Sequence, residues 1–197
     1  MEPDVWVTVF DKNADRYDRW FESHSELYQK ELELIRRCMP EYTKALEIGV
    51  GTGRFAVPLH IEYGVEPAFE MTRIAKERGI CVVRALSEAL PFVAQSLELV
   101  LMVTVVCFLD DIEVAFREAC RVLKPGGTLA VAYIDKYGTL GQDYIRRKEK
   151  STFFSYAIVP ELQEVIQALR GAGFTDTLPE VTSLKAGFVI VCAKKPV

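Results

Sequence analysis

The 197-residue sequence predicts an α/β protein with a doubly wound, mostly parallel β-sheet. Five short apolar runs alternate with helix-like segments between residues 44 and 134, and a glycine-rich segment directly follows the first run. Two further β-like runs near the C-terminus follow each other without a helix between them. Together these observations predict a seven-stranded sheet with helices on both faces and a C-terminal antiparallel hairpin.

The predicted parallel strands are short and almost continuously apolar, as is typical of strands that are buried on both faces. They are residues 44–48, 61–65, 80–83, 98–103 and 128–134. The C-terminal hairpin is predicted at residues 174–182 and 187–193, on the edge of the sheet.

The predicted helices carry apolar residues at a spacing of three or four, and they are residues 25–38, 68–78, 111–123 and 160–169. In the first of them Tyr28, Leu32 and Ile35 share one face, and Pro40 prevents its continuation. Residues 1–22 are polar with aromatic residues mixed in, and residues 136–156 are polar with a basic cluster at 146–150.

Composition excludes several classes of protein. Half of the residues are hydrophobic and the net charge is −4, so the sequence predicts one folded domain with no global attraction to nucleic acid. Five cysteines without a CxxC pair and two histidines predict neither a disulfide framework nor a metal site. The N-terminus lacks signal-peptide features, and no apolar run approaches the ~20 residues that span a membrane, so we expect a cytoplasmic protein.

The most informative segment is the glycine loop at residues 46–55, which follows the first predicted strand. Glycines at 49, 51 and 53 allow a tight turn and the close approach of a ligand. The dinucleotide fingerprint fails because Arg54 replaces its third glycine, and the Gly-Lys-Ser/Thr ending of a phosphate-binding P-loop is absent. The sequence therefore predicts a binding loop at the carboxyl edge of the sheet, with the pattern Glu-x-Gly-x-Gly-x-Gly.

Glu66 ends the second predicted strand, 17 residues after Gly49. An acidic residue about 20 residues beyond such a glycine loop accepts hydrogen bonds from ribose hydroxyls in this topology. A glutamate at a strand end is by itself more often solvated, but its position relative to the loop favours a ribose-binding role.

With these motifs, the sequence resembles the class I S-adenosylmethionine-dependent methyltransferases, in the branch of small-molecule and quinone-biosynthesis enzymes with a methyltransferase type 11 domain. The resemblance covers residues 46–127. It rests on the glycine loop with Glu47, on Gly64-Val65-Glu66-Pro67, on residues 87–92 after the third strand, and on the turn at residues 123–127.

The resemblance implies a Rossmann-like fold, S-adenosylmethionine as the cofactor and S-adenosylhomocysteine as its product. It also implies which residues bind the cofactor: Tyr17, Glu47, Gly49, Val50, Gly51, Thr52, Gly53, Glu66, Pro67, Leu86, Ser87, Glu88 and Thr104. The sequence departs from the family at Ala85-Leu86, where members often carry Gly-Asp and the aspartate binds the adenine amino group. Because Leu86 cannot accept that bond, we expect either that adenine recognition rests on backbone groups and apolar packing or that the affinity for the cofactor is lower than in those members.

Candidate residues for the acceptor side lie in the N-terminal segment, which resembles a segment that closes over the cofactor in related enzymes. Tyr17 is expected at the methionine end of the cofactor, and Trp20 and Phe21 at the wall of the acceptor pocket. The alternative is that these aromatic residues only pack the first helix against the sheet. Tyr17 and His24 are the candidate catalytic residues, His24 as a base, although methyl transfer needs a base only for some acceptors.

The sequence thus predicts methyl transfer from S-adenosylmethionine to a small-molecule acceptor within a single domain. Residues 1–43 are expected to form a lid and the first helix, residues 44–134 the cofactor-binding core, and residues 135–197 the acceptor cap. The Asn/Asp-Pro-Pro motif of nucleobase and glutamine methyltransferases is absent after the fourth strand, which also favours a small acceptor. The alternatives are a non-catalytic relative that binds the cofactor, a methyltransferase for proteins or other substrates, and an NAD-type or nucleotide-sugar enzyme.

Overall fold

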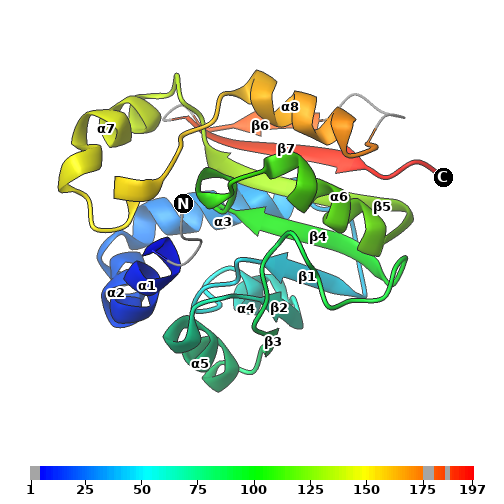
Figure 1. Cartoon of the computed structure of the whole chain (residues 1–197), viewed down its shortest axis with the longest axis horizontal. Coiled ribbons are helices and arrows are strands. Elements are labelled where there is room, and N and C mark those ends of the chain that lie inside the picture. The colour runs from blue at the N-terminus through cyan, green and yellow to red at the C-terminus, as the bar shows by residue number, and fades with distance from the viewer. Residues whose placement is uncertain (1–4, 175–179, 185–186) are drawn as a thin grey trace.

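A computed structural model describes residues 5–174, 180–184 and 187–197. Its strands are β1 (Ala45–Ile48), β2 (Tyr63–Val65), β3 (Cys81–Val83), β4 (Leu97–Val103), β5 (Leu123–Ile134), β6 (Glu180–Ser183) and β7 (Phe188–Lys194). They form one sheet in the order β3-β2-β1-β4-β5-β7-β6 (Figure 1). All pairs from β3 to β5 are parallel, whereas β7 is antiparallel to both β5 and β6. The predicted mostly parallel sheet with a C-terminal antiparallel pair is therefore confirmed.

The helices are α1 (Val5–Lys12), α2 (Ala14–Ser23), α3 (Ser25–Cys38), α4 (Ala56–Leu59), α5 (Phe69–Glu77), α6 (Ile112–Val122), α7 (Thr139–Arg147) and α8 (Leu162–Gly171). Short 3₁₀ turns occupy η1 (Val106–Phe108), η2 (Lys148–Lys150) and η3 (Phe154–Tyr156). Among the described residues, no helix is long and apolar enough to cross a membrane.

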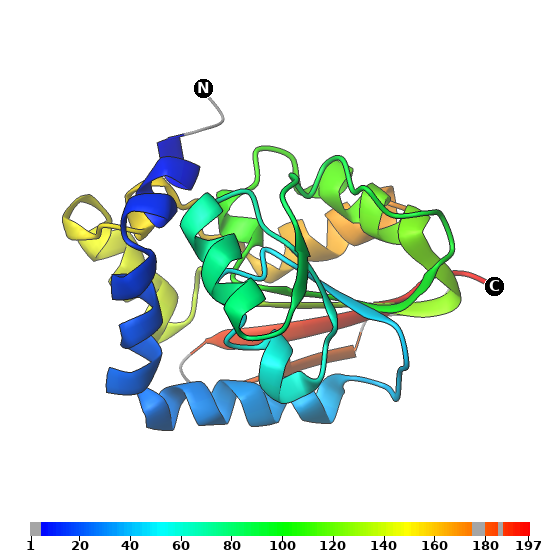
Figure 2. The ribbon, with the colours of Figure 1, turned by 90° about the horizontal axis from the view of Figure 1, so that it is seen from below.

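Helices cover both faces of the sheet, as predicted. On one face α6 and α8 bury Phe116, Val165 and other side chains against alternate strand residues such as Val100 and Val131. On the other face α3 and α4 pack against the intervening residues, such as Leu99 and Leu101. Figure 2 shows α3 along one side of the sheet and α6 and α8 along the other. The continuous apolar runs in the sequence reflect this burial on two sides.

The carboxyl ends of the parallel strands meet α1, α2 and α7, which lie beside that edge in Figure 1. Strand order reverses between β1 and β4, because β2 lies on one side of β1 and β4 on the other. Ligands of open α/β sheets bind in the crevice at such a reversal. The fold thus places the loops after β1, β2 and β4 around one point.

Two predicted boundaries and one segment without predicted helix bounds need correction. The fifth strand begins at Leu123 rather than at residue 128, because Leu123 pairs with Leu97 before the register shifts. The polar segment 136–156, for which no helix bounds were predicted, contains α7. The first run of the predicted hairpin is a strand only at Glu180–Ser183 within the described residues, and residues 175–179 lie outside them.

Candidate functional site

A cavity of about 350 Å³ lies at the carboxyl edge of the sheet, between the strand ends and the N-terminal helices. This volume falls within the range of ~300–1,000 Å³ that is typical of small-molecule sites. Of the predicted cofactor residues, the following line it: Tyr17, Gly49, Gly51, Glu66, Pro67, Leu86, Ser87, Glu88 and Thr104.

The glycine loop borders this cavity with backbone atoms, because Gly49 and Gly51 have no side chains. Gly49 and Gly51 adopt φ angles of +67° and +53°, a region that favours glycine. A Cβ atom on Gly49 would lie 2.4 Å from Val105 Cγ2, so no side chain fits there. A Cβ atom on Gly51 would lie 3.5 Å from the Tyr17 ring across the cavity. The loop therefore leaves space between its backbone and the Tyr17 ring.

The carboxylate of Glu66 lines the cavity and is fixed by hydrogen bonds, and the residue is only 6% exposed. Its Oε2 accepts a hydrogen bond from the Gly51 N–H at 3.0 Å, and its Oε1 accepts one from the Ala68 N–H at 2.9 Å. Burial raises its pKa to about 7, although these two bonds oppose the rise. Each carboxylate oxygen keeps a further lone pair, which suits a ligand with two neighbouring hydroxyls. The ribose of an adenosyl cofactor is such a group, and the residues present fit it.

The remaining predicted loop residues support the loop without lining the cavity. Val50 packs on Gly64, and the buried Thr52 donates a hydrogen bond of 2.7 Å from its hydroxyl to Asp18. Gly53 turns the chain toward α4, with φ of +83°. Burial raises the pKa of Glu47 well above its usual value, and its Oε2 has no hydrogen-bond partner among the described residues. These four residues lie behind the glycine loop rather than in its open space.

Leu86, Ser87 and Glu88 lie on the segment after β3, at the edge of the cavity. Leu86 is 41% exposed and offers no polar side-chain atom. Ser87 donates its hydroxyl hydrogen bond to Glu88 at 2.8 Å. An adenine in this part of the cavity would meet backbone groups, the apolar Leu86 side chain and the Glu88 carboxylate.

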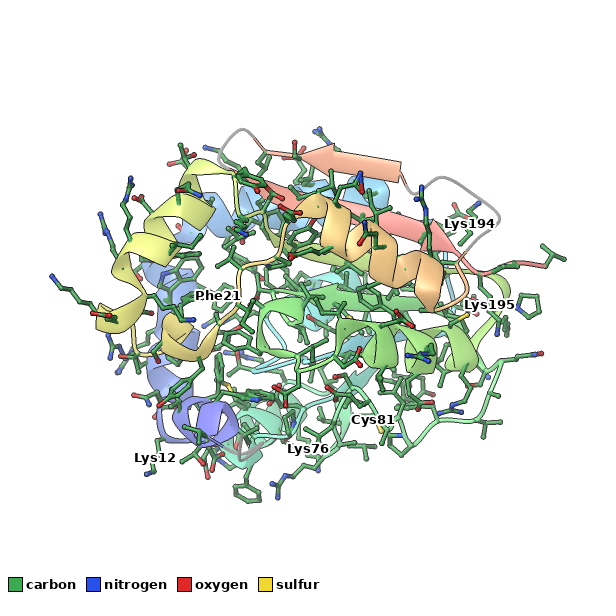
Figure 3. All side chains as sticks on the ribbon, turned by 45° about the horizontal axis from the view of Figure 1, so that its top comes forward. Lys12, Phe21, Lys76, Cys81, Lys194 and Lys195 are labelled. Carbon is green, nitrogen blue, oxygen red and sulfur yellow. The ribbon has the colours of Figure 1, made fainter. Side chains whose placement is uncertain are left out.

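Helices α1 and α2, residues 5–23, are called the lid because their side chains line the cavity and because they lie beside the carboxyl edge of the sheet in Figure 1. Their aromatic rings continue into a cluster with rings from η1 and from residues 153–154. Phe10 lies 5.1 Å from both Phe108 and Phe153, measured between ring centroids, and Tyr17 lies 5.8 Å from Phe153. The Phe21 side chain of α2 packs against the core on the α3 face of the sheet. Figure 3 labels it at one end of the sheet and Lys195 at the other. Tyr17, Trp20 and Phe21 all line the cavity, so they both wall it and pack the lid.

His24 lies outside the cavity lining. It is exposed at the junction of α2 and α3, and its ring stacks on Trp20 at 4.5 Å. Its Nδ1 lies 3.0 Å from the Trp20 carbonyl oxygen. The candidacy of His24 as a base therefore finds no geometric support, because its ring is held against α2 away from the cavity.

Two features of the candidate site, Asp18 and Glu31, were not identified from the sequence. Asp18 on α2 joins the lid to the glycine loop through Thr52, Arg54 and Arg78. Glu31 on α3 is a buried carboxylate that lines the cavity. Its signal was present, because Glu31 falls between Tyr28 and Ile35 on the apolar stripe of its helix, where a charge is out of place.

A metal role finds no support in the described part of the chain, where no group of three or more histidine, cysteine, aspartate or glutamate side chains could hold an ion.

Comparison with known proteins identifies the family of the chain. Residues 46–131 match the family model described as a methyltransferase domain. A crystal structure of a SAM-dependent methyltransferase from Thermotoga maritima, described as a possible histamine N-methyltransferase, is 37% identical in sequence, with a TM-score of 0.90. That match covers 95% of this chain and 99% of the other.

Two curated proteins extend the comparison. An uncharacterised protein of Methanocaldococcus jannaschii is 40% identical over 91% of this chain and 87% of its own length. A malonyl-[acyl-carrier protein] O-methyltransferase of Methylococcus capsulatus is 28% identical over 95% of this chain and 72% of its own length. Together with the fold, these matches show that the chain belongs to the class I S-adenosylmethionine-dependent methyltransferases.

Proposed function

We propose that this protein transfers the methyl group of S-adenosylmethionine to a small-molecule acceptor that binds under the lid. The observation that carries the proposal is the single cavity that joins Glu66 and the glycine loop to the aromatic cluster. The bound cofactor supplies an electrophilic methyl group on its sulfonium sulfur. The protein has to orient the acceptor and exclude water.

The cofactor roles follow from the positions of the lining residues. Glu66 is proposed to accept the ribose hydroxyls, and the Gly49 and Gly51 backbone to face the methionine part. Leu86, Ser87 and Glu88 are proposed to border the adenine, with Pro67 at its ribose side. Thr104 and Tyr17 border the end at which transfer takes place. Glu47, Val50, Thr52 and Gly53 are proposed to keep the loop in shape.

The lid favours a small acceptor. Aromatic residues of α1 and α2, with Phe153 and Phe154, line the cavity together with the glycine loop, so the proposed acceptor site is an apolar pocket of limited size. A net charge of −4 offers no general attraction to nucleic acid. We further propose the division of one domain into lid and first helix (1–43), cofactor core (44–134) and acceptor cap (135–197), acting in the cytoplasm.

A second candidate function is cofactor binding without turnover. The observation behind it is Leu86, which occupies the adenine edge without a hydrogen-bond acceptor in its side chain. Weak cofactor affinity and no transfer to any acceptor would favour this alternative.

The test combines calorimetry with an assay for S-adenosylhomocysteine release. The acceptor panel holds small phenols, carboxylic acids and amines, including histamine, and malonyl-acyl carrier protein as a protein-bound acceptor. We expect cofactor binding and release with at least one small acceptor. Release with the carrier protein alone, or cofactor binding without any release, would overturn the proposal.

A further inference from the structure

Glu31 is a buried residue that has no part in the proposed contacts with the cofactor. It belongs to α3, is 7% exposed and lines the cavity. Its neighbours on the same stripe, Leu32, Leu34 and Ile35, are buried apolar residues of the core. The helix therefore places one acidic side chain where its own packing calls for an apolar one.

The Glu31 carboxylate has no hydrogen bond or ion pair within the described part of the chain. Glu66, by contrast, accepts two backbone N–H groups. Burial alone raises the pKa of Glu31 to about 7. A buried carboxylate without a partner is unfavourable, so such a group in a ligand cavity is usually matched by a ligand donor or cation.

Aromatic rings that line the cavity together with Glu31 also suit a cation. Tyr17 on α2 and Tyr144 on α7 are among them. The Glu31 charge raises the pKa of both phenols, for Tyr144 after the larger effect of burial and for Tyr17 after the larger effects of burial, Glu47 and Glu66. Trp20 and Phe21 line the same cavity. Aromatic faces attract ammonium groups within about 6 Å.

The basic side chains near the cavity bind other partners than the Glu31 carboxylate. Arg16 is the one basic side chain in the lining of the cavity as described; it is exposed and donates its hydrogen bond to Thr152 at 2.9 Å. Arg54 and Arg78 both bind Asp18 on the loop side of α2. A positive group from the ligand is therefore the missing partner.

Glu31 and Glu66 reach the cavity from different elements, because Glu31 belongs to α3 whereas Glu66 follows β2. Glu66 already accepts hydrogen bonds from the Gly51 and Ala68 N–H groups. Of the two carboxylates, Glu31 is therefore the one that both the backbone and the proposed ribose contact leave available.

We propose that Glu31 binds the amino group of a small, otherwise apolar amine, which is the methyl acceptor. This inference rests on the proposed function and specifies its substrate class. The ammonium group gives one proton to the Glu31 carboxylate, and the freed nitrogen lone pair forms the new N–C bond. The C–S bond of the sulfonium breaks with its electron pair remaining on sulfur. The product leaves as a methylated ammonium ion, and the proton on Glu31 passes to solvent.

The experiment compares two pairs of matched ligands with the protein saturated in S-adenosylhomocysteine. The pairs are benzylamine with benzyl alcohol and 2-phenylethylamine with 2-phenylethanol, so that each pair differs in the charged group. Affinities are measured by calorimetry for the wild type, Glu31→Gln and the control Glu33→Gln, whose residue is exposed on the same helix. Glutamine matches the shape of glutamate and removes the charge.

We expect the wild type and Glu33→Gln to bind at least one amine more than tenfold more tightly than its alcohol. Glu31→Gln should lose that preference and keep its affinity for S-adenosylhomocysteine within about twofold. An unchanged preference in Glu31→Gln would overturn the inference. Weaker S-adenosylhomocysteine binding in this variant would overturn it too, because Glu31 would then hold the cofactor's own amino group.

The wild type alone decides the question if the variant does not fold. Equal binding of amine and alcohol in both pairs would refute an amine-selective site. Methyl transfer to a phenol or carboxylic acid without any transfer to an amine would refute the inference while leaving the proposed function intact. Failure to bind S-adenosylhomocysteine at all would instead contradict the proposed function.

Discussion

Asp18 on α2 and Arg78 at the end of α5 form a bidentate ion pair, with both N–O distances at 2.7 Å. Arg78 also donates to the Thr52 carbonyl oxygen at 2.7 Å, and Arg54 donates from Nε to Asp18 at 2.8 Å. One carboxylate thus joins the lid to the glycine loop and to α5. Burial alone would raise the pKa of Asp18, but these hydrogen bonds outweigh it and hold that pKa well below its usual range.

Replacing Asp18 with asparagine should loosen the lid. The substitution removes the charge that two partly buried guanidinium groups share, and we expect the free energy of unfolding to fall by about 1–3 kcal/mol. Cofactor affinity should fall as well, because α2 lines the cavity. Urea denaturation and calorimetry measure the two effects.

The matched control for this change is Asp15→Asn, at an exposed position on the same helix. It should alter the free energy of unfolding by less than about 0.5 kcal/mol. Equal effects of the two substitutions would mean that the Asp18 cluster does not fix the lid.

Glu66→Ala should weaken cofactor binding far more than it weakens the fold. Two ribose hydroxyls lose a charged acceptor, and such hydrogen bonds contribute about 1.5–3 kcal/mol each. Calorimetric titration with S-adenosylhomocysteine should therefore show a loss of at least tenfold. The exposed Glu62→Ala serves as the control, and unchanged affinity in Glu66→Ala would refute the ribose assignment.

The glycine loop can be tested by a pair of alanine substitutions with similar backbone strain. Gly49 and Gly126 have φ angles of +67° and +75°, but only at Gly49 would the new Cβ collide with a neighbour, Val105. At Gly126 nothing lies within 4 Å. Gly126→Ala should cost about 1 kcal/mol through strain alone and keep cofactor affinity. Gly49→Ala should cost more and reduce affinity, and similar melting temperatures and affinities in the two variants would contradict this.

The pH dependence of stability should report on Glu31. Because its pKa rises from the ordinary 4.5 to about 7 on folding, the folded state holds this proton more tightly than the unfolded state does. The stabilisation is present below pH ~4.5 and is lost as the pH rises through about 7, up to about 3 kcal/mol. Glu66 adds a change of the same sign.

Glu31→Gln should therefore lose less stability than the wild type between pH 5 and pH 8. Denaturation midpoints across this range measure the difference. Parallel pH profiles for the two proteins would show that the Glu31 carboxylate is solvated rather than buried.

The sheet and the cofactor side of the site could be predicted because local sequence determines them. The turn after β1 needs glycines, and the Glu66 carboxylate follows β2 at a spacing that the fold dictates. In the sequence, Arg54 served only to exclude a dinucleotide-binding loop. In the structure it forms an ion pair with Asp18. Its partner lies 36 residues away, on a helix whose docking no local pattern reveals.

The acceptor side could not be predicted for the same reason. Glu31, Tyr144 and Phe153 come from three separate segments and meet only after the chain has folded. Helix α7 was missed because its sequence is mainly polar and it buries only Gly141, against the Asp135 backbone. The one local signal was the charge of Glu31 on an apolar helix face.

The central claim is tested most directly by a crystal structure of the protein with S-adenosylhomocysteine. We predict that the ligand lies in the cavity with both ribose hydroxyls within hydrogen-bond distance of the Glu66 carboxylate. Its sulfur should face the part of the cavity that Tyr17, Glu31 and Tyr144 line. A ligand bound elsewhere, or a ribose that does not contact Glu66, would contradict the account.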